Sequence, residues 1–534
     1  MDGNSSKAKI KKAGTLDYKQ TVFVGFAFFL ICAFWQAYDS LIPKILTDKF
    51  GMKQGISGVI MALDNILALF MLPLFGAISD KYNSKRGRRT PFIIWGTVIA
   101  AVAFVFLSLA DSMQLKDLDK VTIENPTALE TLYDADLTIK TPDGETVNIC
   151  DTFTREEFTG FTMYEEGSNE VRVEYTNYVV PARQVYAWNV TKTNPVNLVF
   201  FMVLLMVCLI SMSIFRSPAV ALMPDVTIKP LRSKANAIIN LMGTAGGIII
   251  LILGIVLGTG KTANALMGYG LFFAIVSGIM IISLIIFLLK VNEPALVKKM
   301  EKESRELGIA DEDEDTDEKN SDETQDESGT KHLSGPEFKS LLLILASVVL
   351  WFMGYNAVIS KYSVYAGKVL NVDFNTTLLI AQGAAIISYL PVGVISSKFG
   401  RKKTILGGIV MLAVAFCTAS FLRAGSSVVV MNVLFALAGI GWAYINVNSF
   451  PMVVELSKSG DVGKYTGFYY TASMAAQTVT PILSGVLMDI KFTTLFPYAT
   501  VFVVLAFVTM CLVKHGDSIP GKKKDILENF DIDD

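Results

Sequence analysis

GAISDKY, at residues 76–82, returns as GVISSKF at residues 393–399. A second pair of stretches keeps the same spacing of 317 residues, because YDSLIPK at 38–44 aligns with YNAVISK at 355–361. Two separate pairs that share one offset indicate that the chain consists of two related halves running in the same direction. Accidental similarity between unrelated helices is the alternative explanation.

Apolar runs of about 20 residues recur through both halves, and each can cross about 30 Å of hydrocarbon as a helix. The 534-residue chain is 52% hydrophobic and only 18% charged, with a mean hydropathy of +0.47. Its composition argues against a soluble fold, and its net charge of −2 argues against a nucleic-acid binder. We predict an all-α, multi-pass membrane protein with twelve transmembrane helices, six in each half. The predicted spans are 21–43, 57–79, 91–110, 196–217, 235–258, 265–290, 338–360, 374–396, 404–422, 428–449, 466–487 and 495–514.

Lys and Arg collect in the N-terminal segment and in the loops after spans two, eight and twelve, whereas three opposite loops carry one basic residue each. The positive-inside rule therefore places both termini in the cytoplasm. We expect a monomer in the plasma membrane. The predicted segments are the cytoplasmic N-terminus 1–20, the first six-helix half 21–290, the linker 291–337, the second half 338–514 and the tail 515–534.

Two polar insertions interrupt the helical pattern. Residues 111–195 lie outside the membrane between spans three and four, and hold 16 acidic and 7 basic residues. Apolar residues alternate over 137–149 around a Thr-Pro-Asp-Gly turn, and again over 171–175, which predicts a small β-rich insertion. It is either a structural addition or a lid that gathers substrate. The linker has eleven acids between residues 311 and 327, so we expect a solvated connection rather than a partner-binding tail.

The GAISDK stretch at 76–81, followed by RGRR at 86–89, resembles the loop signature of the major facilitator superfamily. The resemblance implies two six-helix bundles that give alternating access to a central solute. Asp80 is expected to pair with an arginine or a helix N-terminus when the cytoplasmic side closes. The second half has Ser397 in place of the acid, which predicts a weaker gate. The gate candidates are Gly76, Asp80, Arg86, Gly87, Arg88, Arg89, Gly393 and Arg401.

A narrower resemblance rests on the stretch from 73 to 92 and on SPAVALMPD at 217–225. Both are similar to the sucrose-transporter branch and its glycoside–pentoside–hexuronide cation symporter relatives. Sucrose carriers of that branch have an arginine where this chain has Val220. Arg216 lies one helical turn earlier and is the candidate replacement. The difference affects the expected solute more than the expectation of transport.

Charged side chains inside the spans are costly and therefore mark candidate sites. Asp64 is the first candidate for coupling to H⁺ or Na⁺, and Asp39 is the second. The alternative for both is a water-lined or structural role, and for Asp39 also an interfacial one. Lys361 lies at an outer helix end, where snorkelling would explain it, and Asp489 is a gate or interface candidate. Amides and aromatic rings suit a sugar, although many aromatics must serve packing. The substrate candidates are Trp35, Gln36, Tyr38, Asn65, Arg216, Tyr355, Asn356, Gln382, Asn446 and Gln477.

We therefore predict a secondary carrier, not an enzyme, that takes up a sugar or glycoside with H⁺ or Na⁺. The chain has two histidines and no phosphate-binding Gly-rich loop, and we expect no cofactor and no metal site. The alternatives are an exporter or importer of a non-sugar solute, and a receptor-like binding protein that acts through the 111–195 insertion. The partners expected are a small solute, a coupling cation and the lipid bilayer, without nucleic acid.

Overall fold

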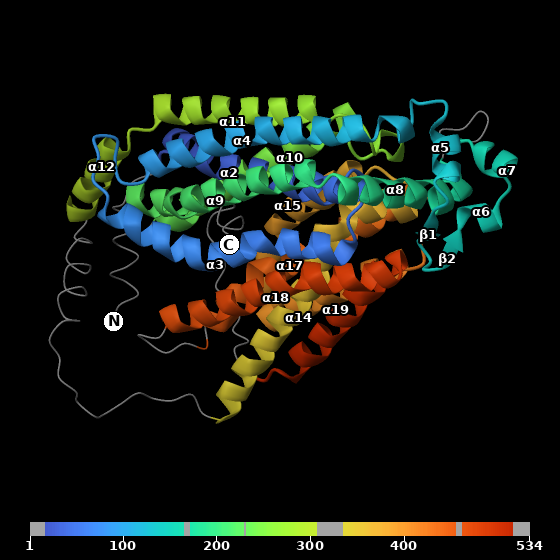
Figure 1. The fold of residues 1–534 in the computed structure, drawn as a ribbon. Helices are drawn as coiled ribbons and strands as arrows, with labels where there is room; N and C mark the ends of the chain where they lie inside the picture. Colours follow the sequence, from blue (N-terminus) through green and yellow to red (C-terminus); the bar gives the residue numbers. More distant parts are fainter. Residues whose placement is uncertain are drawn as a thin grey trace.

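The computed structural model describes residues 16–164, 171–228, 231–306, 335–454, 456 and 462–515. Two bundles of long helices lie side by side (Figure 1). The first bundle contains α2 (Tyr18–Asp48), α3 (Gln54–Lys81), α4 (Thr90–Asp117), α9 (Val196–Val226), α10 (Arg232–Leu257) and α11 (Gly270–Lys290). The second contains α14 (Gly335–Tyr365), α15 (Phe374–Phe399), α16 (Arg401–Ala419), α17 (Val428–Val454), α18 (Val462–Ile490) and α19 (Leu495–Leu512).

Ten helices within the described ranges are long and apolar enough to cross a membrane. The prediction of a helical, multi-pass membrane protein is therefore confirmed. α15 and α18 are not among the ten, although they have 26 and 29 residues and complete the two bundles. The expected count of twelve spans stays a prediction for these two helices.

The packing between the bundles follows the repeat found in the sequence. Each bundle has its own apolar core, one around Phe34 and Phe104 and the other around Trp351 and Tyr362. Across the interface the first helices of the two bundles, α2 and α14, touch each other. α3 packs on α18 and α10 packs on α15, so the second helix of each bundle meets the fifth of the other. The two repeated stretches lie at the same places in equivalent helices, in α2 and α14 and at the ends of α3 and α15.

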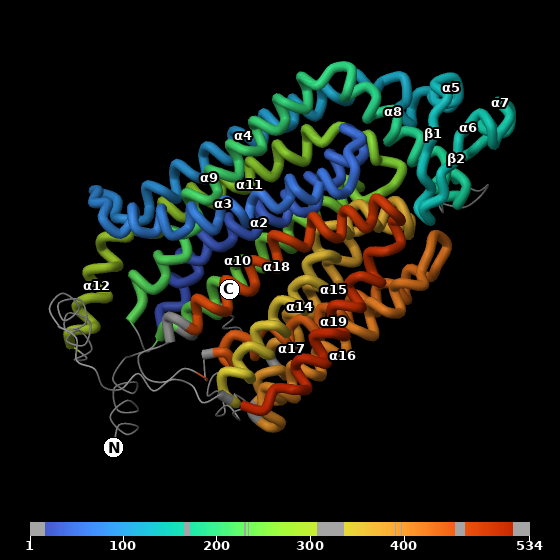
Figure 2. Tube along the Cα trace, turned by 60° about the horizontal axis from the view of Figure 1, so that its bottom comes forward, coloured from blue at the N-terminus to red at the C-terminus, as the bar shows by residue number. Residues whose placement is uncertain are grey.

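Residues 118–164 and 171–195, between α4 and α9, form a compact cap at one end of the bundles (Figures 1 and 2). Its buried apolar side chains, among them Leu132, Ile139, Phe158 and Val179, make a third core. We call this end of the molecule the cap end. The opposite end carries α12 (Glu293–Glu306) and is called the linker end.

The cap is mainly helical, so the expected β-rich insertion is not confirmed, and its described residues form one two-stranded sheet. The hairpin forms from β1 (Thr138–Lys140) and β2 (Thr146–Asn148), with Ile139 opposite Val147. The expected strand over 171–175 is wrong, because after an isolated bridge at Val171 the chain enters a helix. The described residues of the cap also form six helical segments. They are η1 (Asp119–Val121), α5 (Ala128–Asp134), α6 (Ile149–Thr152), α7 (Arg155–Thr159), η2 (Tyr175–Val179) and α8 (Val180–Thr193).

Helices extend further into both insertions than the sequence pattern indicates. α4 runs to Asp117, and its last turns are buried against the rest of the bundle through Asp111 and Gln114. In the linker, α12 is amphipathic and lays Leu296 against the first bundle. The acidic run 311–327 lies outside the described residues, as do residues 1–15 and 516–534.

Candidate functional site

Charged side chains on α2, α3 and α9 of the first bundle lie within electrostatic range of one another. Asp39 and Asp64 are both half-buried and interact electrostatically with each other. Asp64 also interacts with Arg216 and accepts a hydrogen bond from the Asn65 amide at 2.9 Å. The Arg216 guanidinium lies 5.9 Å from the centre of the Trp35 ring. Two ionised carboxylates and one guanidinium carry a net charge of −1, which a bound proton or a monovalent metal cation would neutralise.

A side-chain bridge joins the two bundles near this group. The Gln382 amide on α15 donates a hydrogen bond of 2.7 Å to the Gln36 side-chain oxygen on α2. Gln36 in turn donates to the Ser40 hydroxyl at 3.0 Å. A Cβ on Gly247 would lie 3.5 Å from the Gln382 oxygen and 3.6 Å from the Gln36 oxygen. α10 therefore lies beside both amides, which form an inter-bundle contact of hydrogen-bonding groups.

Several buried polar atoms of the candidates have no hydrogen-bond partner among the described residues. They are Trp35 Nε1, Tyr38 Oη, Asn356 Nδ2 and Gln382 Oε1. A buried polar group without a partner costs about 1–3 kcal/mol, so each atom is suited to a bound solute or water. The first two atoms lie on α2 and the other two on α14 and α15, so both bundles contribute.

The remaining substrate candidates have different surroundings. Tyr355 stacks on Trp442 with ring centres 3.7 Å apart, so the face of each ring toward the other is already covered. Asn446 on α17 and Gln477 on α18 are half-buried, and neither side chain forms a hydrogen bond within the described ranges. The structure thus brings together the candidates on α2, α3, α9 and α15, and leaves these others outside that contact network.

The gate candidates of the first half gather around Arg89 at the linker end. Its guanidinium pairs with Asp225 at 2.8 Å, and also with Asp80 and Ser79. Burial lowers the pKa of Arg89, but the hydrogen bonds and charges of Asp225 and Asp80 outweigh it and hold this pKa above its usual value. Arg88 lies 3.6 Å from Asp225. The partners all belong to the first bundle, so in this structure the cluster fastens α3, α4 and α9 to one another.

Glu293 completes this cluster and was not among the residues predicted from the sequence. Its buried carboxylate accepts hydrogen bonds from the backbone N–H groups of Arg88, Arg89 and Thr90, at 2.6–3.2 Å, and from the Thr90 hydroxyl at 2.7 Å. An anion at the N-terminus of α4 is favourable there. Gly87 has a φ of +105°, and a Cβ on it would lie 2.2 Å from the Glu293 carboxyl carbon. In the sequence, the only indication of this residue is the Glu293-Pro294 pair at the start of the linker.

The other predicted gate residues lie at the same end. Gly76 is half-buried on α3, where a Cβ would lie 2.9 Å from the Ser217 hydroxyl, and Arg86 is exposed. In the second bundle Gly393 lies on α15, and Arg401 begins α16 directly after Gly400. The two corners correspond as the repeat predicts.

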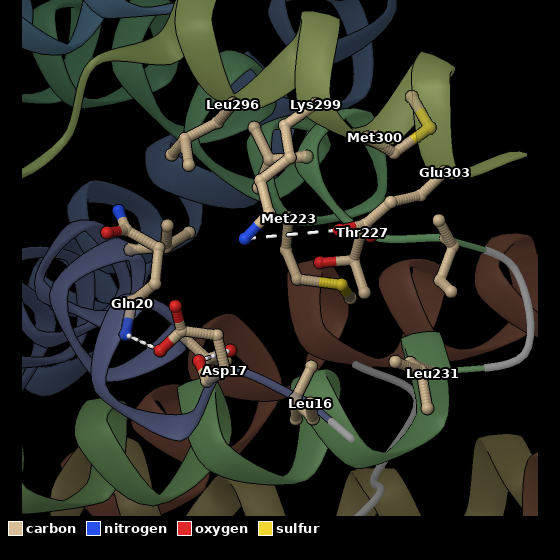
Figure 3. Close-up of a pocket in the computed structure, with 14 residues that line it drawn as sticks. Leu16, Asp17, Gln20, Met223, Thr227, Leu231, Leu296, Lys299, Met300 and Glu303 are labelled. Atoms are coloured by element: carbon tan, nitrogen blue, oxygen red, sulfur yellow. Dashed lines mark hydrogen bonds and ion pairs between the residues drawn. The ribbon is translucent and has the colours of Figure 1, made fainter. Parts of the chain in front are cut away.

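A cavity of about 160 Å³ also lies at the linker end, between α2, α9 and α12 (Figure 3). Apolar side chains such as Met223, Leu296 and Met300 line it beside Asp17 and the Lys299–Glu303 ion pair. It contains none of the predicted solute or cation residues.

The cap end holds a second set of charged contacts, and these join the two bundles. The Lys361 ammonium is fully buried and donates to the Gln54 carbonyl at 2.8 Å, so the snorkelling predicted for it is wrong. The Asp489 carboxylate accepts the backbone N–H groups of Gln54 and Gly55 at 2.6 and 2.7 Å. An acid of the second bundle therefore caps α3 of the first.

Close backbone packing supports these contacts at the cap end. A Cβ on Gly58 would lie 2.0 Å from the Pro481 carbonyl oxygen, and one on Gly485 would lie 2.2 Å from that of Gln54. Such short approaches require glycine on both helices. α3 is largely buried from residue 54 to 62, whereas Leu69, Phe70, Leu74 and Ile78 toward the linker end are exposed. The α3–α18 interface is therefore closely packed at the cap end.

Comparisons with known families agree with this architecture. The sequence model of the Major Facilitator Superfamily matches residues 185–390 and 379–528. The chain belongs to the major facilitator superfamily. Its members are transporters, not enzymes. A second model, described as an MFS/sugar transport protein, matches residues 24–116.

Two curated proteins resemble parts of the chain. One is named as a glycoside/cation symporter, YagG of Escherichia coli strain K12, and is 34% identical over 68 residues, 12% of this chain and 15% of that protein. The other is the MFS-type transporter ppzB of Metarhizium rileyi strain RCEF 4871, 28% identical over 107 residues, 20% of this chain and 22% of that protein. The chain thus matches less than a quarter of the length of either relative.

Solved structures share the fold at low sequence identity. The xylose transporter XylE from E. coli, in an inward-open conformation, has a TM-score of 0.55 at 14% identity, over 96% of this chain and 98% of that chain. A bacterial homologue of the iron transporter ferroportin, in an inward-facing state, has a TM-score of 0.51 at 13% identity, over 93% and 99%. Carriers named for a sugar and for iron are similar to a comparable degree, so the fold does not select the solute.

Proposed function

We propose that this transporter takes up a sugar or glycoside together with H⁺ or Na⁺. Two observations carry the proposal: Asp64 interacts electrostatically with Arg216, and a hydrogen bond from Gln382 to Gln36 joins the bundles. Amide groups from both bundles can hydrogen-bond to the hydroxyl groups of a sugar. The unpartnered polar atoms can form further hydrogen bonds with such a solute. The match to the sugar-transport model and the symporter relative support this solute class.

In this proposal Asp64 carries the coupling cation, with Asp39 as its neighbour. Protonation or Na⁺ binding at Asp64 would weaken its attraction to Arg216 and free the guanidinium for the solute. Solute and cation would then favour the same conformation, which is the physical requirement for coupled transport. Trp35, under the guanidinium, would hold its position.

We further infer that the cap end faces outward and that both termini face the cytoplasm of a plasma-membrane protein. The Lys- and Arg-rich loops lie at the linker end, which supports this orientation. The inter-bundle contacts at the cap end then close the outer side, and the structure corresponds to an inward-facing state. Opening the outer side requires the cap-end contacts to break while the solute stays between the bundles.

A ligand panel tests the solute class. Purified protein is heated with di- and monosaccharides, glycosides, amino acids and nucleosides, and a ligand that binds the folded state raises the melting temperature. We expect a sugar or glycoside to stabilise the native protein and to lose this effect in Gln382→Ala. Stabilisation by a non-sugar solute alone would refute the sugar assignment.

A further inference from the structure

The cap is fastened to the first bundle at the end of α2. α8 of the cap continues through Pro195 into α9. Gly51, with a φ of +67°, lies so close that a Cβ would be 2.3 Å from the Trp188 nitrogen. The Gln184 side chain donates to the Met52 carbonyl at 3.2 Å. Since these contacts are short and involve backbone, the cap moves with the first bundle.

The hairpin of the cap reaches across to the second bundle. The Phe492 N–H in η6 (Phe492–Thr494) donates to the Pro142 carbonyl at 3.0 Å. The Lys140 ammonium donates to the Asp489 carbonyl at 2.8 Å. Lys491 lies 3.4 Å from the Asp143 carboxylate. The turn of the hairpin therefore clasps the corner between α18 and α19.

A second contact lies on the far side of the same interface. Asn371 follows η5 (Ala366–Leu370) of the second bundle and donates to the Thr176 hydroxyl of the cap at 2.7 Å. The Lys368 ammonium pairs with the Gln184 side chain and lies 3.8 Å from Asp48. The cap thus holds the second bundle at two places, through the hairpin and through η2 and α8.

We propose that the cap is a clasp that keeps the outer side closed and thereby sets the balance between the inward-facing and outward-facing states. The idea rests on the alternating access of the proposed function. Because the cap moves with the first bundle, separating the bundles at the cap end must release Phe492, Lys491 and Asn371 from it. The clasp contributes only to the closed state, so weakening it shifts the population toward the outward-facing state.

Gly144 offers a selective way to weaken the clasp. It has a φ of +91°, and a Cβ on it would lie 2.8 Å from the Ile490 carbonyl oxygen of the second bundle. Alanine there strains the hairpin in both states but clashes only in the closed one. Gly425 is the matched control, because its φ of +82° carries the same backbone strain and nothing lies within 4 Å of its Cβ position.

The experiment measures how often the cap end opens. The five native cysteines of the full-length protein are replaced, and Thr259→Cys adds a single thiol. Thr259 is fully buried, and its hydroxyl accepts a hydrogen bond from Asn375 of the second bundle. The protein is reconstituted in nanodiscs and treated with a polar maleimide. We expect Gly144→Ala to raise the labelling rate about tenfold above that of Gly425→Ala. Equal rates in the two variants would overturn the proposal.

A charge exchange provides a second test if Gly144→Ala fails to fold. Asp143→Lys should raise the labelling rate about two- to fivefold, and adding Lys491→Asp should restore it. Failure of the double variant to restore the rate would contradict the clasp. Labelling needs no solute, so a shifted rate without sugar uptake would support the clasp while refuting the proposed solute.

Discussion

The alanine variant of Gly485 tests the closed interface at the cap end most severely. Gly485 lies on α18, where a Cβ would be 2.2 Å from the Gln54 carbonyl oxygen and 2.7 Å from its carbon on α3. Both atoms are backbone, so no side-chain rotation relieves the clash. The same carbonyl accepts the Lys361 ammonium, and the adjacent N–H groups bind Asp489. Separating the helices therefore also weakens those hydrogen bonds.

The size of the effect follows from this geometry. Restoring an ordinary contact of 3.4 Å requires α3 and α18 to move apart by about 1.2 Å. Overpacking of this kind costs about 1–3 kcal/mol, which corresponds to about a 5- to 150-fold change in an equilibrium. The clash exists only while the cap end is closed. Gly485→Ala should therefore favour the outward-facing state by about this factor.

The assay uses the buried Thr259→Cys thiol and a matched control on the same helix. Gly467 has no atom within 4 Å of its Cβ position, so Gly467→Ala should label like the parent protein. We expect Gly485→Ala to label at least about fivefold faster than Gly467→Ala. Equal labelling, with both variants folded, would refute the interpretation of α3 and α18 as the closed outer gate.

Three further substitutions test the charged and amide contacts. Lys49→Met leaves the fully buried Asp111 carboxylate without its ion pair and should cost about 3–5 kcal/mol of stability. The double variant with Asp111→Leu should have a melting temperature closer to that of the parent, and equal melting temperatures of the two variants would contradict the pairing. Glu293→Gln weakens the cap of α4 and should lower the melting temperature by an amount that corresponds to about 1–2 kcal/mol, while Glu303→Gln, in an exposed pair, should not. Gln382→Ala removes the hydrogen bond to Gln36 and should weaken solute binding at least about fivefold, and unchanged affinity would exclude the bridge from the site.

The repeat and the apolar runs were sufficient to predict the two-bundle helical architecture. They succeed because each span must satisfy its own backbone hydrogen bonds in lipid, so length and composition decide the helix. The cap was harder, since alternation over 171–175 resembles a strand while those residues join a helix that packs against the cap core through Tyr175 and Val179. Short apolar alternation does not distinguish the two.

The candidate site stays a prediction. Residue type alone selects Asp64, Asp39, Arg216, Gln36 and Gln382, because charged and amide groups in spans are rare and costly. Their neighbours across the bundles depend on tertiary packing and leave no local pattern. Lys361 shows why sequence alone is insufficient here. Its position near a helix end suits snorkelling, yet its buried ammonium donates a hydrogen bond to the Gln54 carbonyl of the other bundle.

The central claim, cation-coupled uptake of a sugar by alternating access, is tested most directly by one substitution at Asp64. Proteoliposomes containing the native protein, Asp64→Asn or the exposed-residue control Asp119→Asn are given a labelled sugar or glycoside from the ligand panel, with and without an imposed H⁺ or Na⁺ gradient. We predict that Asp64→Asn loses gradient-driven accumulation and retains exchange, while Asp119→Asn keeps both. Unchanged accumulation in Asp64→Asn would contradict the account.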